Sequence, residues 1–234
     1  MKLGPYELGP NNTPENGIYI GDARELAKTI PDESVDLIFT DPPYEKKYQE
    51  LYKWLPRIAE RILKPDGFLL CYVPPYYKNI IFKWFDKYLI YFWDYIEYNK
   101  GNSTIIWPRR TISRYKSILA YRKNDQSLPT TNVLGVWPGG ETNRYGDKRF
   151  HKWGQSEYTA RYYIQVFKRS GIVFDPLVGG GTTAWVCKQL QMQYLAFEID
   201  SITASLARAR VALANDMLFI PQPLQLEMDV ENER

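Results

Sequence analysis

The sequence contains few of the residues that build metal centres and disulfide frameworks. Its 234 residues include one histidine, His151, and two cysteines, Cys71 and Cys187. Both cysteines lie in apolar surroundings and are expected to be buried free thiols. One imidazole and two thiols do not make up the ligand set of a zinc site, so we expect no bound metal.

Long apolar runs are also missing. No stretch approaches the length of apolar sequence that spans a bilayer, and no secretory signal opens the chain. We therefore expect a cytoplasmic protein with no part in the membrane. A chain of 234 residues is long enough for one domain with a full core and too short for two large ones.

Net charge is small, +3, but the charge is unevenly distributed. Residues 100–152 carry eleven Lys and Arg against three Asp and Glu, and tryptophans and tyrosines are interleaved with them. This pattern indicates a surface that faces nucleic-acid phosphates, and a merely solvated basic face is the alternative. The candidates for phosphate contact are Arg109, Arg110, Arg114, Arg144, Lys148 and Arg149.

Apolar runs alternate with helical periodicity and predict an α/β fold. Strands are expected at residues 17–22, 35–39, 68–73, 92–98, 117–121, 171–174 and 194–198, and helices at 24–30, 52–63, 78–89, 157–168, 183–190 and 202–214. Such alternation implies right-handed crossovers and a doubly wound, mostly parallel sheet, with an antiparallel edge formed by residues 92–98 and 117–121. Ser156 is a candidate N-cap.

The buried strand at residues 35–39 leads into Asp41-Pro42-Pro43-Tyr44. Side chains at the carboxyl end of a strand in an open α/β sheet fall in the crevice where ligands bind. The two prolines fix φ and remove two N–H donors, which leaves nearby carbonyl oxygens free to accept hydrogen bonds. A carboxylate, a carbonyl and an aromatic ring suit a planar base that carries an amino group. The alternative is an ordinary proline-rich turn.

A second motif, Asp-Pro-Leu-Val-Gly-Gly-Gly-Thr at residues 175–182, joins a strand to a helix. Its glycines permit a tight turn and close approach to a ligand, and the helix N-terminus offers free N–H groups. Glu198 ends the next strand, about twenty residues on, where an acid binds ribose in nucleotide-binding βαβ units; the alternative is an exposed strand-end acid. The turn lacks Gly-Lys-Thr, which favours a nucleoside-like cofactor without phosphates.

Together the two motifs resemble the DNA amino-methyltransferases, which use S-adenosylmethionine to methylate N6 of adenine or N4 of cytosine. The resemblance covers residues 17–214. It implies a Rossmann-like methyltransferase fold, duplex DNA as the partner, and a role in DNA methylation within restriction–modification. Aspartate at the head of the first motif favours adenine N6. The Asp-Pro-Pro-Tyr half precedes the glycine-loop half, as in the permuted group, and this order favours DNA over RNA or protein.

The resemblance also assigns roles to residues. A base flipped out of the duplex would stack on Tyr44 while Asp41 and the Pro42 carbonyl accept its amino hydrogens. Asp22, on a strand expected beside the Asp41 strand, would contact the cofactor's adenine or cap the following helix. The catalytic candidates are Asp41, Pro42, Pro43 and Tyr44. The cofactor-binding candidates are Asp22, Gln155, Asp175, Pro176, Gly179, Gly181, Thr182 and Glu198, with Gln155 on the methionine side.

On the same basis the chain divides into an irregular arm at residues 1–16, one methyltransferase domain at 17–220 and a disordered tail at 221–234. The domain comprises a catalytic half (17–122), a short loop-rich insertion for target recognition (123–150) and a cofactor half (151–220). Its short insertion leaves open a homodimer that supplies contacts in trans. The alternative functions are an RNA amino-methyltransferase and a DNA-binding module with a vestigial site.

Overall fold

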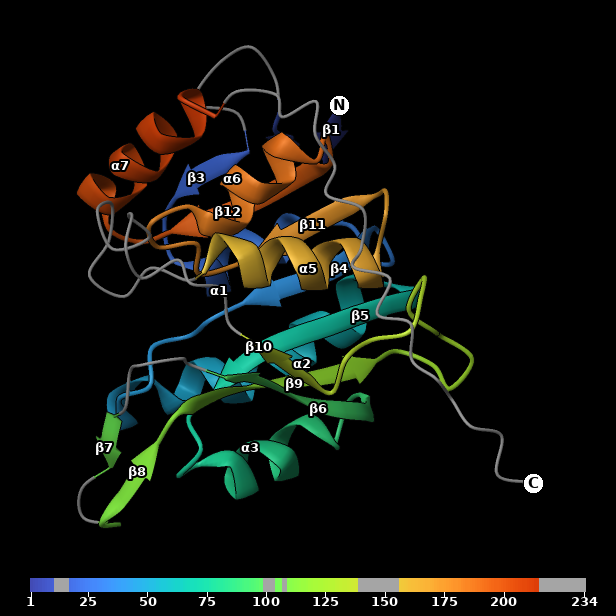
Figure 1. Ribbon diagram of the computed structural model, residues 1–234. Helices are drawn as coiled ribbons and strands as arrows, with labels where there is room; N and C mark the ends of the chain where they lie inside the picture. The colour runs from blue at the N-terminus through green and yellow to red at the C-terminus, as the bar shows by residue number, and fades with distance from the viewer. Residues whose placement is uncertain (11–16, 99–103, 107–108, 139–155, 215–234) are drawn as a thin grey trace.

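The computed structural model describes residues 1–10, 17–98, 104–106, 109–138 and 156–214 (Figure 1). An eight-stranded sheet runs through this part of the chain in the order β10-β6-β9-β5-β4-β11-β12-β3. Its strands are β3 (Ile18–Ile20), β4 (Val35–Thr40), β5 (Leu63–Val73), β6 (Ile90–Tyr98), β9 (Tyr115–Arg122), β10 (Val136–Pro138), β11 (Ile172–Asp175) and β12 (Gln193–Glu198).

The sheet is mostly parallel, which confirms the predicted fold class. Strands β5, β4, β11, β12 and β3 pair in parallel, whereas β9 is antiparallel to both β5 and β6. The predicted antiparallel pairing of β6 and β9 is present toward one side of the sheet, with β9 between β5 and β6. One strand was not predicted: β10, from the insertion that was expected to be irregular, adds to β6 in parallel and is the outermost strand.

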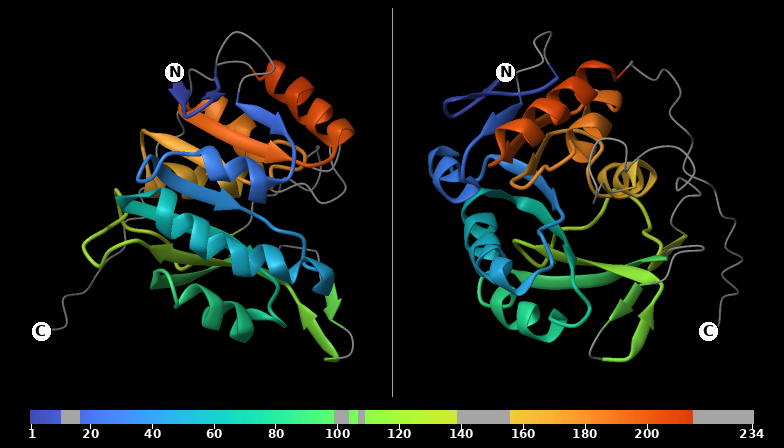
Figure 2. Two further views of the ribbon diagram at one scale, coloured as in Figure 1. Left: turned by 180° about the vertical axis from the view of Figure 1, so that it is seen from behind. Right: turned by 90° about the vertical axis from the view of Figure 1, so that its left-hand side faces the viewer.

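Helices cover both faces of the sheet. On one face lie α1 (Ala23–Leu26), α2 (Gln49–Ile62) and α3 (Lys78–Phe85), and on the other α5 (Glu157–Phe167), α6 (Thr182–Gln189) and α7 (Ser201–Ala212) (Figure 2). Successive strand residues supply two separate cores, since side chains alternate across a sheet. In β4, Ile38 belongs to the first core, and Leu37 and Phe39 belong to the second. Cys71 and Cys187 are buried free thiols, as predicted.

The N-terminal arm is more ordered than predicted. Strands β1 (Lys2–Leu3) and β2 (Tyr6–Glu7) form a short antiparallel pair. Leu3, Tyr6 and Leu8 are buried in the first core. Gly9 forms an isolated bridge to Tyr194 of β12, and a Cβ at Gly9 would lie 2.1 Å from that ring. The prediction of an irregular arm weighed its glycines and prolines and overlooked these apolar residues.

Two further expectations need correction. Strand β3, which precedes Asp22, pairs with β12 and not with β4, because β11 and β12 lie between them. The crossover from β3 through α1 therefore skips two strands that come later in the sequence. The stretch between β6 and β9 contains a hairpin, β7 (Thr104–Ile106) and β8 (Thr111–Ser113), where a loop was expected. This hairpin projects from the body of the molecule (Figure 1).

No helix in the described ranges has the length and apolar character needed to cross a bilayer. Among the same residues, no cluster of three or more His, Cys, Asp and Glu side chains could hold a metal ion.

Candidate active site

The candidate residues gather where the sheet changes its winding direction. From β4 the chain crosses over through α2 to β5 on one side, and from β11 it crosses over through α6 to β12 on the other. β4 and β11 are adjacent and parallel. The carboxyl ends of two such strands form the crevice in which doubly wound proteins bind ligands. Asp41 follows β4 and Asp175 ends β11, so the two sequence motifs lie at neighbouring strand ends on the same edge of the sheet.

The Asp41 carboxyl is buried, and one of its two oxygens lacks a hydrogen bond within the described part of the chain. Its Oδ1 atom is inaccessible to solvent and has no partner at hydrogen-bond distance in the described part of the chain, and the nearby Tyr44 hydroxyl favours the ionised form of the carboxyl. Burial raises the pKa of Asp41 from 3.8 to about 7, and the charge of Lys116 on β9 opposes the shift. A buried acceptor without a donor is unfavourable, so this atom is suited to receive an N–H from a ligand.

Two tyrosine hydroxyls fix the backbone of the Asp-Pro-Pro-Tyr turn. Tyr52, buried on α2, donates to the carbonyl of Pro42 at 3.0 Å. Tyr76, in the turn before α3, donates to the carbonyl of Tyr44 at 2.9 Å. A carbonyl oxygen has two lone pairs, so the Pro42 oxygen can accept a second hydrogen bond from a ligand. Sequence reasoning did not find either tyrosine, because no local motif links them to the turn.

A second carboxylate, that of Glu97, lies near Asp41, and the sequence analysis did not identify it. Glu97 on β6 is 3% exposed and accepts hydrogen bonds from Tyr72 at 2.9 Å and Thr159 at 3.0 Å. Its charge contributes to the raised pKa of Asp41. The sequence carried a signal for its burial, since Glu97 follows the buried Tyr95 by two residues and therefore faces the same side of the strand.

The glycine-rich turn and the acid of β12 are in direct contact. Gly179 and Gly181 have φ values of 50° and 81°, in the left-handed region that glycine adopts most readily. The Gly179 N–H donates to Oε2 of Glu198 at 3.0 Å. The structure therefore brings together two elements that the sequence analysis paired only by their spacing.

Both carboxylate oxygens of Asp175 accept hydrogen bonds from the glycine-rich turn and the start of α6. Its Oδ2 accepts from the Thr183 hydroxyl at 2.6 Å, and its Oδ1 accepts from the Leu177 N–H at 3.1 Å. Burial raises the pKa of Asp175 to about 6, and the hydrogen bond from Thr183 opposes the shift. Asp175 is thus placed to shape the glycine-rich turn.

A buried arginine supports the same turn from behind. Arg210 on α7 donates to the carbonyl of Gly180 at 2.8 Å and to the Thr182 hydroxyl at 3.1 Å, and it pairs with Glu157 at 2.5 Å. Sequence reasoning gave Arg210 no role. The sequence does contain an indication that Arg210 is buried, because it lies on the apolar face of α7, three residues after the buried Ala207.

Comparison with known proteins gives relatives of one kind. No family model matches the chain. The chain is 26% identical to the type II methyltransferase M.BamHI of Bacillus amyloliquefaciens, in an alignment that covers 79% of this chain. It is also 26% identical to the type II methyltransferase M.BglII of Bacillus subtilis over 82% of its length. This chain is similar to type II methyltransferases. It spans 54% of the length of M.BamHI and 69% of M.BglII.

Solved structures show the same architecture. The PvuII DNA methyltransferase, described as cytosine-N4-specific, aligns with a TM-score of 0.74 at 18% identity, over 92% of this chain and 91% of that protein. The complex of M1.HpyAVI with S-adenosylmethionine aligns with a TM-score of 0.68 at 21% identity, over 83% of this chain and 98% of that one. At these identities the likeness establishes the fold, a Rossmann-like methyltransferase fold.

Asp22 lies away from Asp41, since it follows β3, which pairs with β12 beyond the glycine-rich turn. It caps α1 by accepting from the Arg24 N–H at 2.9 Å, and the Arg24 side chain pairs with it at 2.6 Å. The Arg24 hydrogen bond lowers the pKa of Asp22. The neighbouring Gly21 N–H donates to the carbonyl of Glu198 at 2.9 Å, so Asp22 sits beside the other predicted cofactor residues.

The remaining candidates are only partly covered by the described residues. Pro176 and Thr182 are buried within the glycine-rich turn, and Pro43 is exposed. Arg109, Arg110 and Arg114 are exposed at the end and base of the β7–β8 hairpin. The candidates Gln155, Arg144, Lys148 and Arg149 lie outside the described residues.

Proposed function

We propose that this protein is an S-adenosylmethionine-dependent DNA methyltransferase that modifies the exocyclic amino group of a flipped base, with adenine N6 as the first choice. The observation that carries the proposal is Asp41 Oδ1, a buried acceptor with no partner at hydrogen-bond distance among the described residues, followed in the chain by the Pro42 carbonyl that accepts a hydrogen bond from Tyr52. Two adjacent acceptors, placed where the sheet changes its winding direction, suit an amino group with two hydrogens. Similarity to type II methyltransferases supports the same reaction class and a restriction–modification setting.

The residues of the second motif suit S-adenosylmethionine. Left-handed glycines at 179 and 181 leave the backbone open to close approach, and the N–H groups at the start of α6 could receive the methionine carboxylate. Glu198 would bind the ribose hydroxyls at the expense of its bond to Gly179. Asp22 would hold the adenine and Gln155 the methionine side.

The contribution of the chain to the chemistry is positioning. S-adenosylmethionine, when bound, supplies an electrophilic methyl carbon on a sulfonium centre. Asp41 Oδ1 and the Pro42 oxygen accept the two amino hydrogens, which withdraws the nitrogen lone pair from conjugation with the ring. Tyr44 offers its face to the base. With a pKa of about 7, Asp41 is also suited to take the proton that the alkylated nitrogen releases.

Adenine is favoured because aspartate heads the motif. Cytosine N4 is the second candidate, since the PvuII enzyme with the same fold is cytosine-N4-specific. The catalytic motif precedes the glycine-rich turn in the chain, and we assign the protein to the permuted group on that order.

The test separates cofactor binding from transfer. Asp41→Ala should bind S-adenosylmethionine as the wild type does in calorimetry and transfer no methyl group to duplex DNA. Gly179→Trp should lose cofactor binding, because a large side chain at a left-handed position fills the turn. Undiminished turnover in Asp41→Ala would exclude this mechanism. Wild-type protein that binds duplex DNA but no cofactor would indicate a vestigial site.

A further inference from the structure

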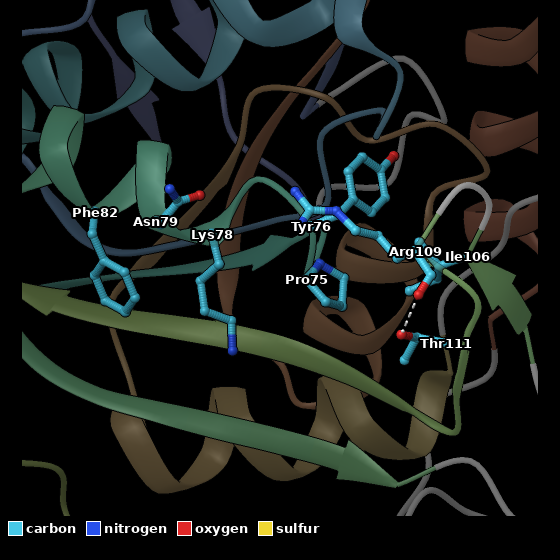
Figure 3. Close-up of a pocket in the computed structure, with 8 residues that line it drawn as sticks. All are labelled: Pro75, Tyr76, Lys78, Asn79, Phe82, Ile106, Arg109 and Thr111. Atoms are coloured by element: carbon cyan, nitrogen blue, oxygen red, sulfur yellow. Dashed lines mark hydrogen bonds between the residues drawn. The ribbon is translucent and has the colours of Figure 1, made fainter.

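A pocket of about 510 Å³ lies beside the active-site turn, between the β7–β8 hairpin and the start of α3 (Figure 3). Its volume is within the range of small-ligand sites, about 300–1,000 Å³. Tyr76 and Phe82 contribute aromatic surface, and Arg109, Lys78 and Asn79 contribute polar groups. Aromatic faces combined with cations are typical of surfaces that bind nucleotides.

The positive charge of the pocket is concentrated on its hairpin wall. Lys78 is already neutralised by Asp94 at 2.7 Å. Arg109 is exposed, and its side chain makes no ion pair among the described residues. The sequence from 104 to 116 contains Arg109, Arg110, Arg114 and Lys116 and no acidic residue. This wall therefore attracts an anionic group, and Arg109 is the cation that lines the pocket.

The pocket is joined to the proposed active site by one side chain. Tyr76 lines the pocket, and its hydroxyl donates to the carbonyl of Tyr44 at 2.9 Å. A ligand that packs against Tyr76 therefore also restrains the turn that carries Asp41. Figure 3 shows the Tyr76 ring between α3 and the hairpin, with Arg109 beside it.

We propose that this pocket binds a nucleotide next to the methylation target on the DNA strand, with Arg109 on its phosphate and its sugar or base against Tyr76. The inference rests on the proposed function, because it takes duplex DNA as the substrate. A strand that delivers its target base to Asp41 continues past Tyr44, and each step of that strand brings another phosphate. Occupation of the pocket then couples DNA binding to the geometry of the Asp-Pro-Pro-Tyr turn.

The phosphate contact is tested by the salt dependence of DNA binding. A short fluorescein-labelled duplex of mixed sequence is titrated with the full chain over a series of KCl concentrations. Arg109→Ala should weaken binding and reduce the slope of log K against log salt by about 1. Arg109→Lys should restore the slope. The matched control is Arg169→Ala, because Arg169 is exposed just before β11, at the opposite end of the parallel strands.

The coupling is tested with Tyr76→Phe, which keeps the ring and removes only the hydroxyl. Methyl transfer should slow by about five-fold, the effect of one hydrogen bond, while DNA affinity and cofactor affinity stay at wild-type values.

An Arg109→Ala slope equal to that of the Arg169→Ala control would overturn the pocket inference, as would unchanged transfer by Tyr76→Phe. Either result in a protein that still methylates DNA leaves the proposed function standing. A wild type that neither binds nor methylates duplex DNA overturns both.

Discussion

Replacing Asp41 with asparagine should stabilise the folded protein at neutral pH while it impairs the proposed active site. Above its pKa the wild type holds an ionised carboxylate at a buried position, with no partner for Oδ1 at hydrogen-bond distance among the described residues. Burial moves the pKa of Asp41 from 3.8 to about 7. Each pKa unit corresponds to about 1.4 kcal/mol, so the ionised form costs at most about 4 kcal/mol of folding free energy. Asparagine is neutral and avoids this cost.

The sign of the pH dependence follows from the direction of the shift. Folded Asp41 holds its proton more tightly than unfolded Asp41, so wild-type stability falls as pH rises from about 4 to about 7 and is level above that range. The stability gain of Asp41→Asn should be close to zero below pH about 4 and largest above pH about 7. Urea unfolding followed by tryptophan fluorescence, at a series of pH values, measures it.

The same titration governs the reaction rate. Only the carboxylate accepts both an amino hydrogen and the released proton, so wild-type turnover should rise with pH through about 7. The residual turnover of Asp41→Asn should lack this limb, because an amide does not titrate there. Stability curves of wild type and Asp41→Asn that stay parallel from pH about 4 to about 8 would show that folding does not raise the pKa of Asp41.

Three further substitutions test the supports of the site. Arg210→Met should lower the free energy of unfolding by about 3 kcal/mol and weaken cofactor binding in calorimetry, because it leaves the Gly180 carbonyl and the half-buried Glu157 without their cation; unchanged affinity would argue against its role. Tyr52→Phe should cost about 1 kcal/mol and slow methyl transfer at unchanged cofactor affinity, since it frees the Pro42 carbonyl; wild-type turnover would contradict this. Ser156→Ala should cost about 1 kcal/mol in urea unfolding through the lost N-cap and leave cofactor affinity as it was.

Local patterns predicted the elements that carry the two motifs. The apolar run before Asp41 became the fully buried strand β4, and the glycine-rich turn lies between β11 and α6 as expected. Ser156 caps α5, as predicted, by accepting from the Thr159 N–H. These successes share a cause, because periodicity and capping are decided by residues within a few positions of each other.

The remainder depends on contacts between distant parts of the chain. The place of β3 at the edge of the sheet depends on two strands that occur some 150 residues later, so the strand order could not be inferred from β3 and β4 alone. Tyr52, Glu97 and Arg210 reach the site from separate elements, and only their tertiary placement gives them a role.

Identification of the methylated nucleoside shows directly whether the protein methylates an amino group of a DNA base. The protein is incubated with unmethylated duplex DNA and methyl-labelled S-adenosylmethionine, and the DNA is digested and analysed by mass spectrometry. We expect label in N6-methyladenine, with N4-methylcytosine as the second candidate. Label at a ring carbon, or none in DNA when cofactor binding has been verified, would contradict the account, and structured RNA would be the next substrate to examine.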